Sequence, residues 1–405
     1  MTLQFCIERG MLGSTEHFSF VDGKGSWTDT IPDETWVLAS TPRKEFCLQT
    51  LLRLNGIELN TSVPSKHIRT MELTMKDTYS YDRVPWRHVV PSREYKSFFM
   101  SLLQNVRSAA RAVDPTYYTE TFSRVTPLFE GLEHAAINVP KLEEYLANPK
   151  TSNPHTLKSF KPIAGSFARR VEYDRFGART GRLTMKNGPD ILTLKKDYRD
   201  VITSRFQKGT IKYVDFSSLE ARVMMTVAGE KVDVKDIYTK IGRQLGLTKS
   251  RKIVKLIVIA TIYGSGTGDL QRLAGISERQ MLETQDKIRE MFKVDALRIR
   301  LSEEWHRLDG KIRNAYGRMV ITPDESTLIN SYVQSTAVDV ALLGFWEFVQ
   351  DMRQRELKSR PIFILHDAIL IDTHPSEELT IDEMVGNGVK VTGMSNTFFL
   401  DASDI

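Results

Sequence analysis

The sequence has little cysteine and no long apolar run. Cys6 and Cys47 are the two cysteines among 405 residues, and they form neither a disulfide framework nor a CxxC metal site. No stretch is long and apolar enough for a transmembrane helix, and no signal peptide is recognisable. These absences exclude a disulfide-stapled scaffold and predict a protein of the reducing cytoplasm without a membrane partner.

A large excess of one charge sign is also missing. Lys and Arg number 56 against 51 Asp and Glu, which leaves a formal net charge of +5. This mildly basic balance is compatible with a polyanionic partner, although many proteins without such a partner share it. The length is sufficient for two or three domains with a large core.

One stretch centres on Asp215. Residues 211–214 are typical of a short buried strand, Ser217 and Ser218 offer N-cap oxygens, and residues 219–222 favour a helix. A carboxylate at the end of a buried strand costs desolvation energy unless a cation or donors meet it. The pattern therefore indicates a divalent ion such as Mg²⁺, which prefers carboxylate oxygens and substrate phosphates.

A second carboxylate, Asp367, interrupts another apolar segment. Residues 361–365 and 368–371 are two apolar runs joined by His366 and Asp367, which predicts a hairpin with a polar tip. Two acids presented in this way could hold two ions for phosphoryl or nucleotidyl transfer.

Between the two acids, residues 250–264 predict a helix with a functional face. Arg251, Lys255, Ile259 and Tyr263 recur every four positions, so they share one side of the helix. Two cations one turn apart suit a triphosphate, and an apolar residue and an aromatic ring further along suit a base pair. Gly264 would end the helix.

Taken in order, these stretches resemble motifs A, B and C of the family A DNA polymerases, the group typified by bacterial DNA polymerase I. Residues 180–184 resemble the family's Thr-Gly-Arg-Leu segment, and residues 330–334 resemble its Asn-x-x-x-Gln helix. The resemblance extends from about residue 170 to the C-terminus. It implies an α+β right-hand polymerase fold with an antiparallel-sheet palm, helical fingers and a helical thumb.

The resemblance also implies a division into parts. The expected boundaries are an N-terminal region of unknown role at 1–85, a helical thumb-like part at 86–165, palm with motif A at 166–230, fingers with motif B at 231–325, and palm with motif C at 326–405. Family members often carry a proofreading exonuclease that begins with an Asp-x-Glu strand. Since residues 1–85 contain no such triplet, we expect a phage-type member that lacks this domain.

Each matched residue acquires an expected role from the resemblance. Asp215 and Asp367 are the expected catalytic residues and ligands of two Mg²⁺ ions, with Mn²⁺ as an alternative. The expected nucleotide-binding residues are Arg251, Lys255, Ile259, Tyr263, Glu220 and Tyr238. The expected nucleic-acid-binding residues are Arg182, Thr180, Asn330, Gln334, His366 and Arg318.

Three positions depart from the family pattern. Ala368 replaces the Glu that commonly follows His-Asp, so metal binding would rest more fully on Asp215 and Asp367. Ile259 stands where an aromatic residue is usual. Tyr238 stands where a phosphate-contacting His is usual, and a phenol cannot become cationic near neutral pH.

The resulting hypothesis is a DNA polymerase that extends a primer on primer-template DNA with deoxynucleoside triphosphates. Single-subunit RNA polymerases, which share the palm and the His-Asp motif, are one alternative, and a polymerase-like subunit that only binds nucleic acid is another. Glu220 favours a DNA polymerase over an RNA polymerase, because the family places a Glu there as a steric gate against the 2′-hydroxyl. The retained acids and helix cations argue against the second. A separate exonuclease or processivity subunit remains an open partner.

Overall fold

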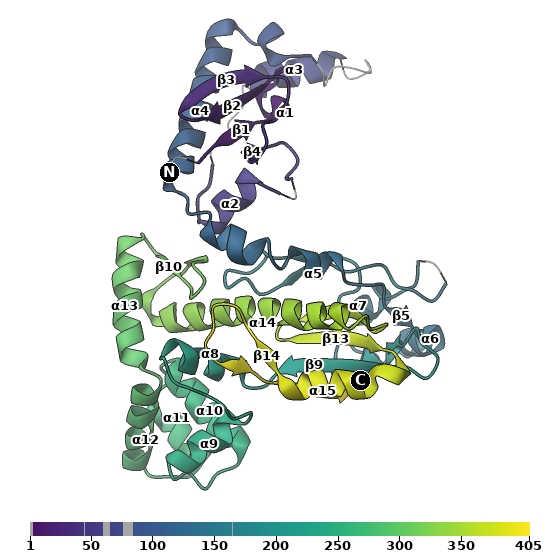
Figure 1. Cartoon of the computed structure of the whole chain (residues 1–405), viewed down its shortest axis with the longest axis vertical. Helices are drawn as coiled ribbons and strands as arrows, with labels where there is room; N and C mark the ends of the chain where they lie inside the picture. Colours follow the sequence, from purple (N-terminus) through teal and green to yellow (C-terminus); the bar gives the residue numbers. More distant parts are fainter. Residues whose placement is uncertain (1–2, 44, 60–64, 76–83, 164) are drawn as a thin grey trace. The chain divides into compact units, whose positions relative to one another are not determined.

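The structure is a computed structural model that describes residues 3–43, 45–59, 65–75, 84–163 and 165–405 (Figure 1). The chain divides into two compact units, Met1–Ser123 and Arg124–Ile405. Within the described residues, no helix is both long and apolar enough to cross a membrane.

The first unit is built on a four-stranded sheet with the strand order β3-β2-β1-β4. Strand β1 pairs antiparallel with β2 and parallel with β4. The elements of this unit are β1 (Phe5–Ile7), α1 (Arg9–Leu12), β2 (His17–Val21), β3 (Lys24–Thr28), β4 (Trp36–Leu38), α2 (Leu48–Leu54), α3 (Ser65–Met75) and α4 (Ser92–Ala112).

Helix α4 packs against the first unit's own elements. The rings of Phe18 on β2 and Phe99 on α4 lie 5.0 Å apart. The Tyr95 hydroxyl of α4 donates to the Leu12 carbonyl at 3.1 Å. The predicted helix is present. The boundary between the compact units falls after Ser123, within the part expected at 86–165, whose thumb-like role stays a prediction.

The second unit holds the remaining elements. They are α5 (Thr126–Glu130), β5 (Ala136–Ile137), α6 (Val139–Ala147), α7 (Pro154–Lys158), β6 (Glu172–Asp174), β7 (Thr184–Asn187), β8 (Ile202–Thr203), β9 (Thr210–Phe216), α8 (Leu219–Val227), α9 (Ile237–Gln244), α10 (Arg251–Ile262), α11 (Thr267–Ala274), α12 (Glu278–Met291), α13 (Val294–Arg307), β10 (Lys311–Arg313), β11 (Met319–Ile321), α14 (Leu328–Gln354), β12 (Arg360–Leu365), β13 (Ala368–Thr373), α15 (Glu378–Asn387), β14 (Val389–Lys390), β15 (Thr397–Phe398) and β16 (Leu400–Asp404).

The centre of the second unit is an antiparallel sheet with the order β12-β13-β9-β16. All three predicted strands are confirmed as β9, β12 and β13, and His366 and Asp367 form the tip of the β12–β13 hairpin. All six residues of β13 are buried. Helices α14 and α15 run beside the sheet (Figure 1), and their apolar side chains join the sheet in one core.

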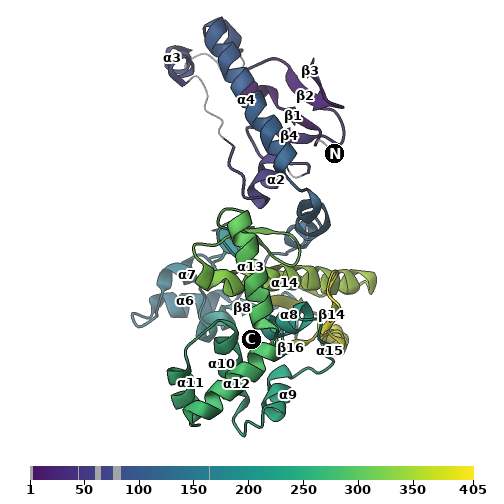
Figure 2. The ribbon, with the colours of Figure 1, turned by 90° about the vertical axis from the view of Figure 1, so that its left-hand side faces the viewer.

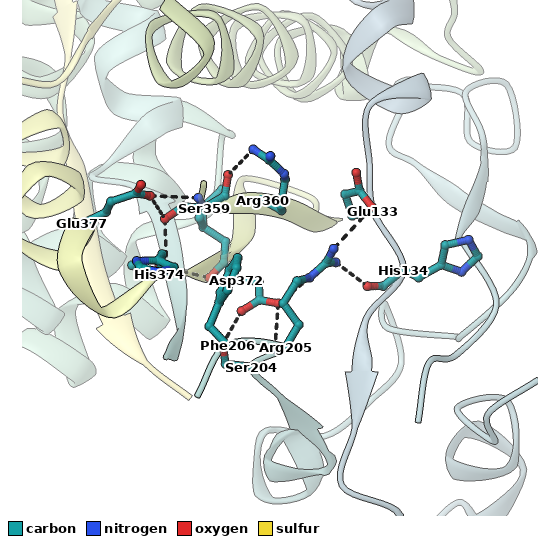
Figure 3. Close-up of polar contacts among 12 residues, drawn as sticks. Glu133, His134, Ser204, Arg205, Phe206, Ser359, Arg360, Asp372, His374 and Glu377 are labelled. Atoms are coloured by element: carbon teal, nitrogen blue, oxygen red, sulfur yellow. Dashed lines mark hydrogen bonds and ion pairs between the residues drawn. The ribbon is translucent and has the colours of Figure 1, made fainter. Parts of the chain in front are cut away.

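A polar network stabilises the end of this sheet that lies away from the hairpin tip (Figure 3). The Asp372 carboxylate is fully buried and accepts hydrogen bonds from the Ser204 hydroxyl at 2.6 Å and from Arg205 Nε at 3.0 Å. Ser359 donates to Glu377 at 2.6 Å in the same network. Because its partners satisfy it, Asp372 is a structural acid.

Helices α9 to α12 lie within residues 231–325, and they gather below the sheet in Figure 2. The assignment of these residues to fingers stays a prediction. Asp236 caps α9 by accepting from the Thr239 amide at 3.1 Å. Helix α10 ends as predicted, with Gly264 in the left-handed conformation at φ 84°. These local signals set where the helices begin and end.

Candidate active site

The pairing of β9 with β13 brings the two predicted acids together. Asp215 lies opposite Ala368 in the register, and the Phe216 amide donates to the Asp367 carbonyl at 3.0 Å. The tip of the hairpin therefore lies beside the last residues of strand β9. Asp215 and Asp367 line one cleft of about 440 Å³. The two acids are thus close enough to act together, as the sequence analysis expected of ligands for two ions.

A third acid, Asp401, stands on the other side of Asp215. Strand β16 pairs with β9 so that Asp401 lies opposite Asp215, and residues paired in this way point to the same face of a sheet. Burial, followed by the charges of Asp367 and Asp401, raises the pKa of Asp215 to about 6. Asp401 also forms an ion pair with Lys235 at 2.9 Å.

Sequence reasoning missed Asp401. The same pattern that drew attention to Asp215 is present here: a carboxylate directly follows a short apolar run, residues 398–400. The run lies close to the C-terminus and matches none of the quoted motifs. Its pairing with β9 gives this acid its place in the cleft.

Helix α10 presents three of the four residues of its predicted face to the cleft, and Tyr263 does not line it. Arg251, Lys255 and Ile259 line the same cavity as the acids. Arg251 Nε forms an ion pair with Asp236 at 3.1 Å. Ser218 is the N-cap residue of α8, but its side chain makes no capping hydrogen bond, and its hydroxyl instead accepts from Arg251 at 3.5 Å.

Glu220 lies in the first turn of α8 and contacts two other segments, the end of α10 and the loop that carries Arg182. The Tyr263 hydroxyl donates to one carboxylate oxygen at 2.7 Å, and an Arg182 nitrogen approaches the other at 3.7 Å. Burial, followed by the nearby Glu220 charge, raises the pKa of Tyr263, so the phenol remains a neutral donor. Glu220 is thus oriented from both sides at the cleft.

The residues expected to contact nucleic acid separate into two groups. Arg182, His366 and Gln334 line the cleft. Thr180 and Asn330 do not line it, and the Asn330 Oδ1 is buried without a hydrogen-bond partner in the described part of the chain. A buried acceptor of this kind calls for a water or a ligand.

The expectation for Arg318 needs correction. Its guanidinium is buried, lies 3.5 Å from the buried Asp339 carboxylate, and donates to the Arg175 carbonyl at 3.2 Å. A side chain added at Gly181 would collide with Arg318. Arg318 therefore supports the loop that carries Arg182 from within the core and offers little surface to DNA.

Comparison with known proteins decides the family. A family model described as DNA polymerase family A matches residues 133–396, well over half of the chain. This chain belongs to DNA polymerase family A. The match covers all three motifs that carried the resemblance.

The family A chain is distantly related to DNA polymerase I of Mycobacterium bovis and of Mycobacterium tuberculosis. It is 20% identical to each over 302 residues, which cover 67% of this chain and 33% of the relative. The chain thus spans about a third of the length of these curated relatives.

Its fold resembles that of a solved polymerase structure. The POL domain of Pol1 from M. smegmatis, in complex with DNA primer-template and dNTP, aligns with a TM-score of 0.57 and 12% identity. The alignment covers 100% of this chain and 95% of that domain. The predicted α+β right-hand polymerase fold is confirmed.

The carboxylates of the cleft suit Mg²⁺ ions that bind together with the phosphates of a substrate. No group of three or more His, Cys, Asp or Glu side chains that could hold a metal occurs in the described residues. Mg²⁺ usually takes one or two protein carboxylates and completes its shell with waters and substrate phosphates. Asp215 and Asp367, in one cleft with two phosphate-binding candidates, fit that requirement.

Proposed function

We propose that this chain is a template-directed DNA polymerase that adds deoxynucleotides to the 3′ end of a primer. The observation that carries the proposal is that Asp215, Asp367, Arg251 and Lys255 line one and the same cleft. Acids for metal ions and cations for a triphosphate are the parts that nucleotidyl transfer needs. The solved relative was bound to primer-template and dNTP, which supports the same partners here.

In the proposed reaction the primer 3′-hydroxyl oxygen bonds to the α-phosphorus, and the bond from that phosphorus to the bridging oxygen breaks. Two Mg²⁺ ions held by Asp215 and Asp367 would, when bound, favour loss of the hydroxyl proton to solvent water and stabilise the leaving pyrophosphate. Arg251 and Lys255 would contact the phosphates by charge-assisted hydrogen bonds. Mn²⁺ is the alternative ion.

The remaining residues would position the two substrates. Ile259 and Tyr263 follow the cations along α10 and would pack on the nascent base pair. Arg182 would test the minor groove near the primer end, where an Arg senses base-pair shape without reading sequence.

Primer extension tests the proposal. The purified chain, a primed template and Mg²⁺ should yield products that lengthen with deoxynucleoside triphosphates. The Asp215→Asn variant serves as the inactive control. Extension with ribonucleotides at the same rate would instead support the RNA polymerase alternative, and binding without extension would support a non-catalytic subunit. The cytoplasmic location remains a prediction.

A further inference from the structure

One aromatic ring lies beneath both cations of α10. Tyr238, the second residue of α9, is 1% exposed. The Arg251 guanidinium carbon lies 5.6 Å from the centroid of its ring, and the Lys255 Nζ lies 5.9 Å from the same centroid. Both distances are within the range of cation–π attraction.

We propose that Tyr238 is a positioning residue whose ring holds Arg251 and Lys255 ready for a triphosphate, while its hydroxyl makes no essential phosphate contact. The proposal rests on the proposed function. The family resemblance led us to expect Tyr238 to contact phosphate itself, as the usual His does. Tyr238 lines the same cleft as the two cations, but at 1% exposure it offers a ligand almost no surface.

The contacts of Arg251 show what this positioning achieves. Its Nε is occupied by the Asp236 carboxylate at 3.1 Å, and the Tyr238 ring lies against its guanidinium. An arginine carries five N–H donors in a planar fork. Nε is engaged by Asp236, and Nη2 makes one long hydrogen bond of 3.5 Å to the Ser218 hydroxyl. The other N–H donors on the two terminal nitrogens remain for a phosphate, while the Tyr238 ring supports the guanidinium.

The platform is itself rigidly held. Asp236, next to Ile237 at the start of α9, accepts from both the amide and the hydroxyl of Thr239. The preceding segment is anchored by the fully buried Arg222, which donates to the Val234 carbonyl at 2.9 Å and the Lys235 carbonyl at 3.0 Å. Long cationic side chains lose much rotational freedom when they bind a ligand. A rigid ring beneath them removes part of that freedom beforehand, which favours binding.

Two substitutions separate the ring from the hydroxyl. Tyr238→Phe keeps the ring, and Tyr238→Leu removes it while leaving an apolar side chain. The measurement is the equilibrium Kd of the correct deoxynucleoside triphosphate on a dideoxy-terminated primer-template, where no chemistry occurs, together with kcat and KM on an extendable primer. Tyr145→Leu is the matched control, because it removes a ring that lies 5.1 Å from Lys141 on α6.

We expect Tyr238→Phe to keep the Kd within about twofold of the wild type, and Tyr238→Leu to weaken it by about tenfold with a smaller change in kcat. Adding Arg251→Ala should cost less in the Tyr238→Leu background than in the wild type, because the ring acts partly through Arg251. A loss in Tyr238→Phe as large as in Tyr238→Leu would overturn the proposal, since the hydroxyl would then be the phosphate contact. An unchanged Kd in Tyr238→Leu would overturn it as well.

A second measurement covers the case in which Tyr238→Leu does not fold. Phenylalanines with increasing fluorination, incorporated at position 238, weaken the negative face of the ring with little change in its size. The Kd should rise steadily with fluorination, and a flat series would contradict the proposal. If the wild-type chain extends no primer at all, the proposed function fails. If the wild type extends primers but the Kd does not change across the fluorinated series, only the inference about Tyr238 fails.

Discussion

Tyr263 donates its hydroxyl hydrogen to the Glu220 carboxylate across 2.7 Å, and this bond connects the end of α10 to the first turn of α8. Arg182 approaches the second carboxylate oxygen at 3.7 Å. Glu220 also lines the cleft that contains both acids. A carboxylate fixed from two sides at such a place suits a barrier against a sugar 2′-hydroxyl.

We therefore predict that Glu220→Ala relaxes sugar selection. The wild type should prefer deoxynucleotides strongly, and the variant should admit ribonucleotides at least about tenfold more readily, because discrimination of one small group amounts to roughly 1–3 kcal/mol. The measurement is the ratio of kcat/KM for the two nucleotide types. Glu230→Ala, which removes a surface acid paired with Lys293 at 3.8 Å, should leave the ratio unchanged. Equal use of ribonucleotides by the wild type would defeat the gate assignment.

Loss of either catalytic acid should stop chemistry without releasing DNA. Asp215→Asn and Asp367→Asn each remove a metal ligand but no cation, so we expect nucleotide addition to fall by about 100-fold or more. Affinity for primer-template, measured by fluorescence anisotropy, should stay within about twofold. Asp404→Asn is the control, since this acid is exposed on β16. Near wild-type extension by either variant would contradict two-metal catalysis.

The raised pKa of Asp215 predicts a stability difference without metal. Because the folded-state pKa is about 6 and the ordinary value is 3.8, the fold disfavours the ionised carboxylate. The resulting destabilisation of the folded state is absent below about pH 4, grows between about pH 4 and pH 6, and is complete above about pH 6. In EDTA at pH 7, Asp215→Asn should be more stable than the wild type by on the order of 1 kcal/mol, and the two should converge near pH 4. Urea unfolding at both pH values checks this; a less stable variant at pH 7 would refute it.

The chain should not trim a mismatched 3′ end. Residues 1–85 contain no Asp-x-Glu triplet, and the described part of the first unit holds no group of three or more potential metal-binding side chains. A gel assay with an unpaired 3′ terminus and Mg²⁺ should therefore show no shortening. Metal-dependent trimming that persists in Asp215→Asn would reveal an exonuclease site outside the polymerase cleft.

Local patterns in the sequence were sufficient for the elements that carry the site. The four-residue spacing from Arg251 to Tyr263 predicted α10, because a helix makes its hydrogen bonds within one segment. The apolar runs around His366 and Asp367 predicted the hairpin for a similar reason, since both strands and their turn are adjacent in the chain. Both acids were singled out in this way, whereas Glu220 acquired its expected role from the family resemblance.

Contacts between distant segments decided the rest. Asp401 joins the cleft through the pairing of β16 with β9, and Arg318 is buried because Asp339, 21 residues away, lies beside it in the core. Tyr238 serves both cations because α9 packs on α10. Strand order and side-chain burial depend on which surfaces meet after collapse, and neither periodicity nor capping within one segment encodes that choice.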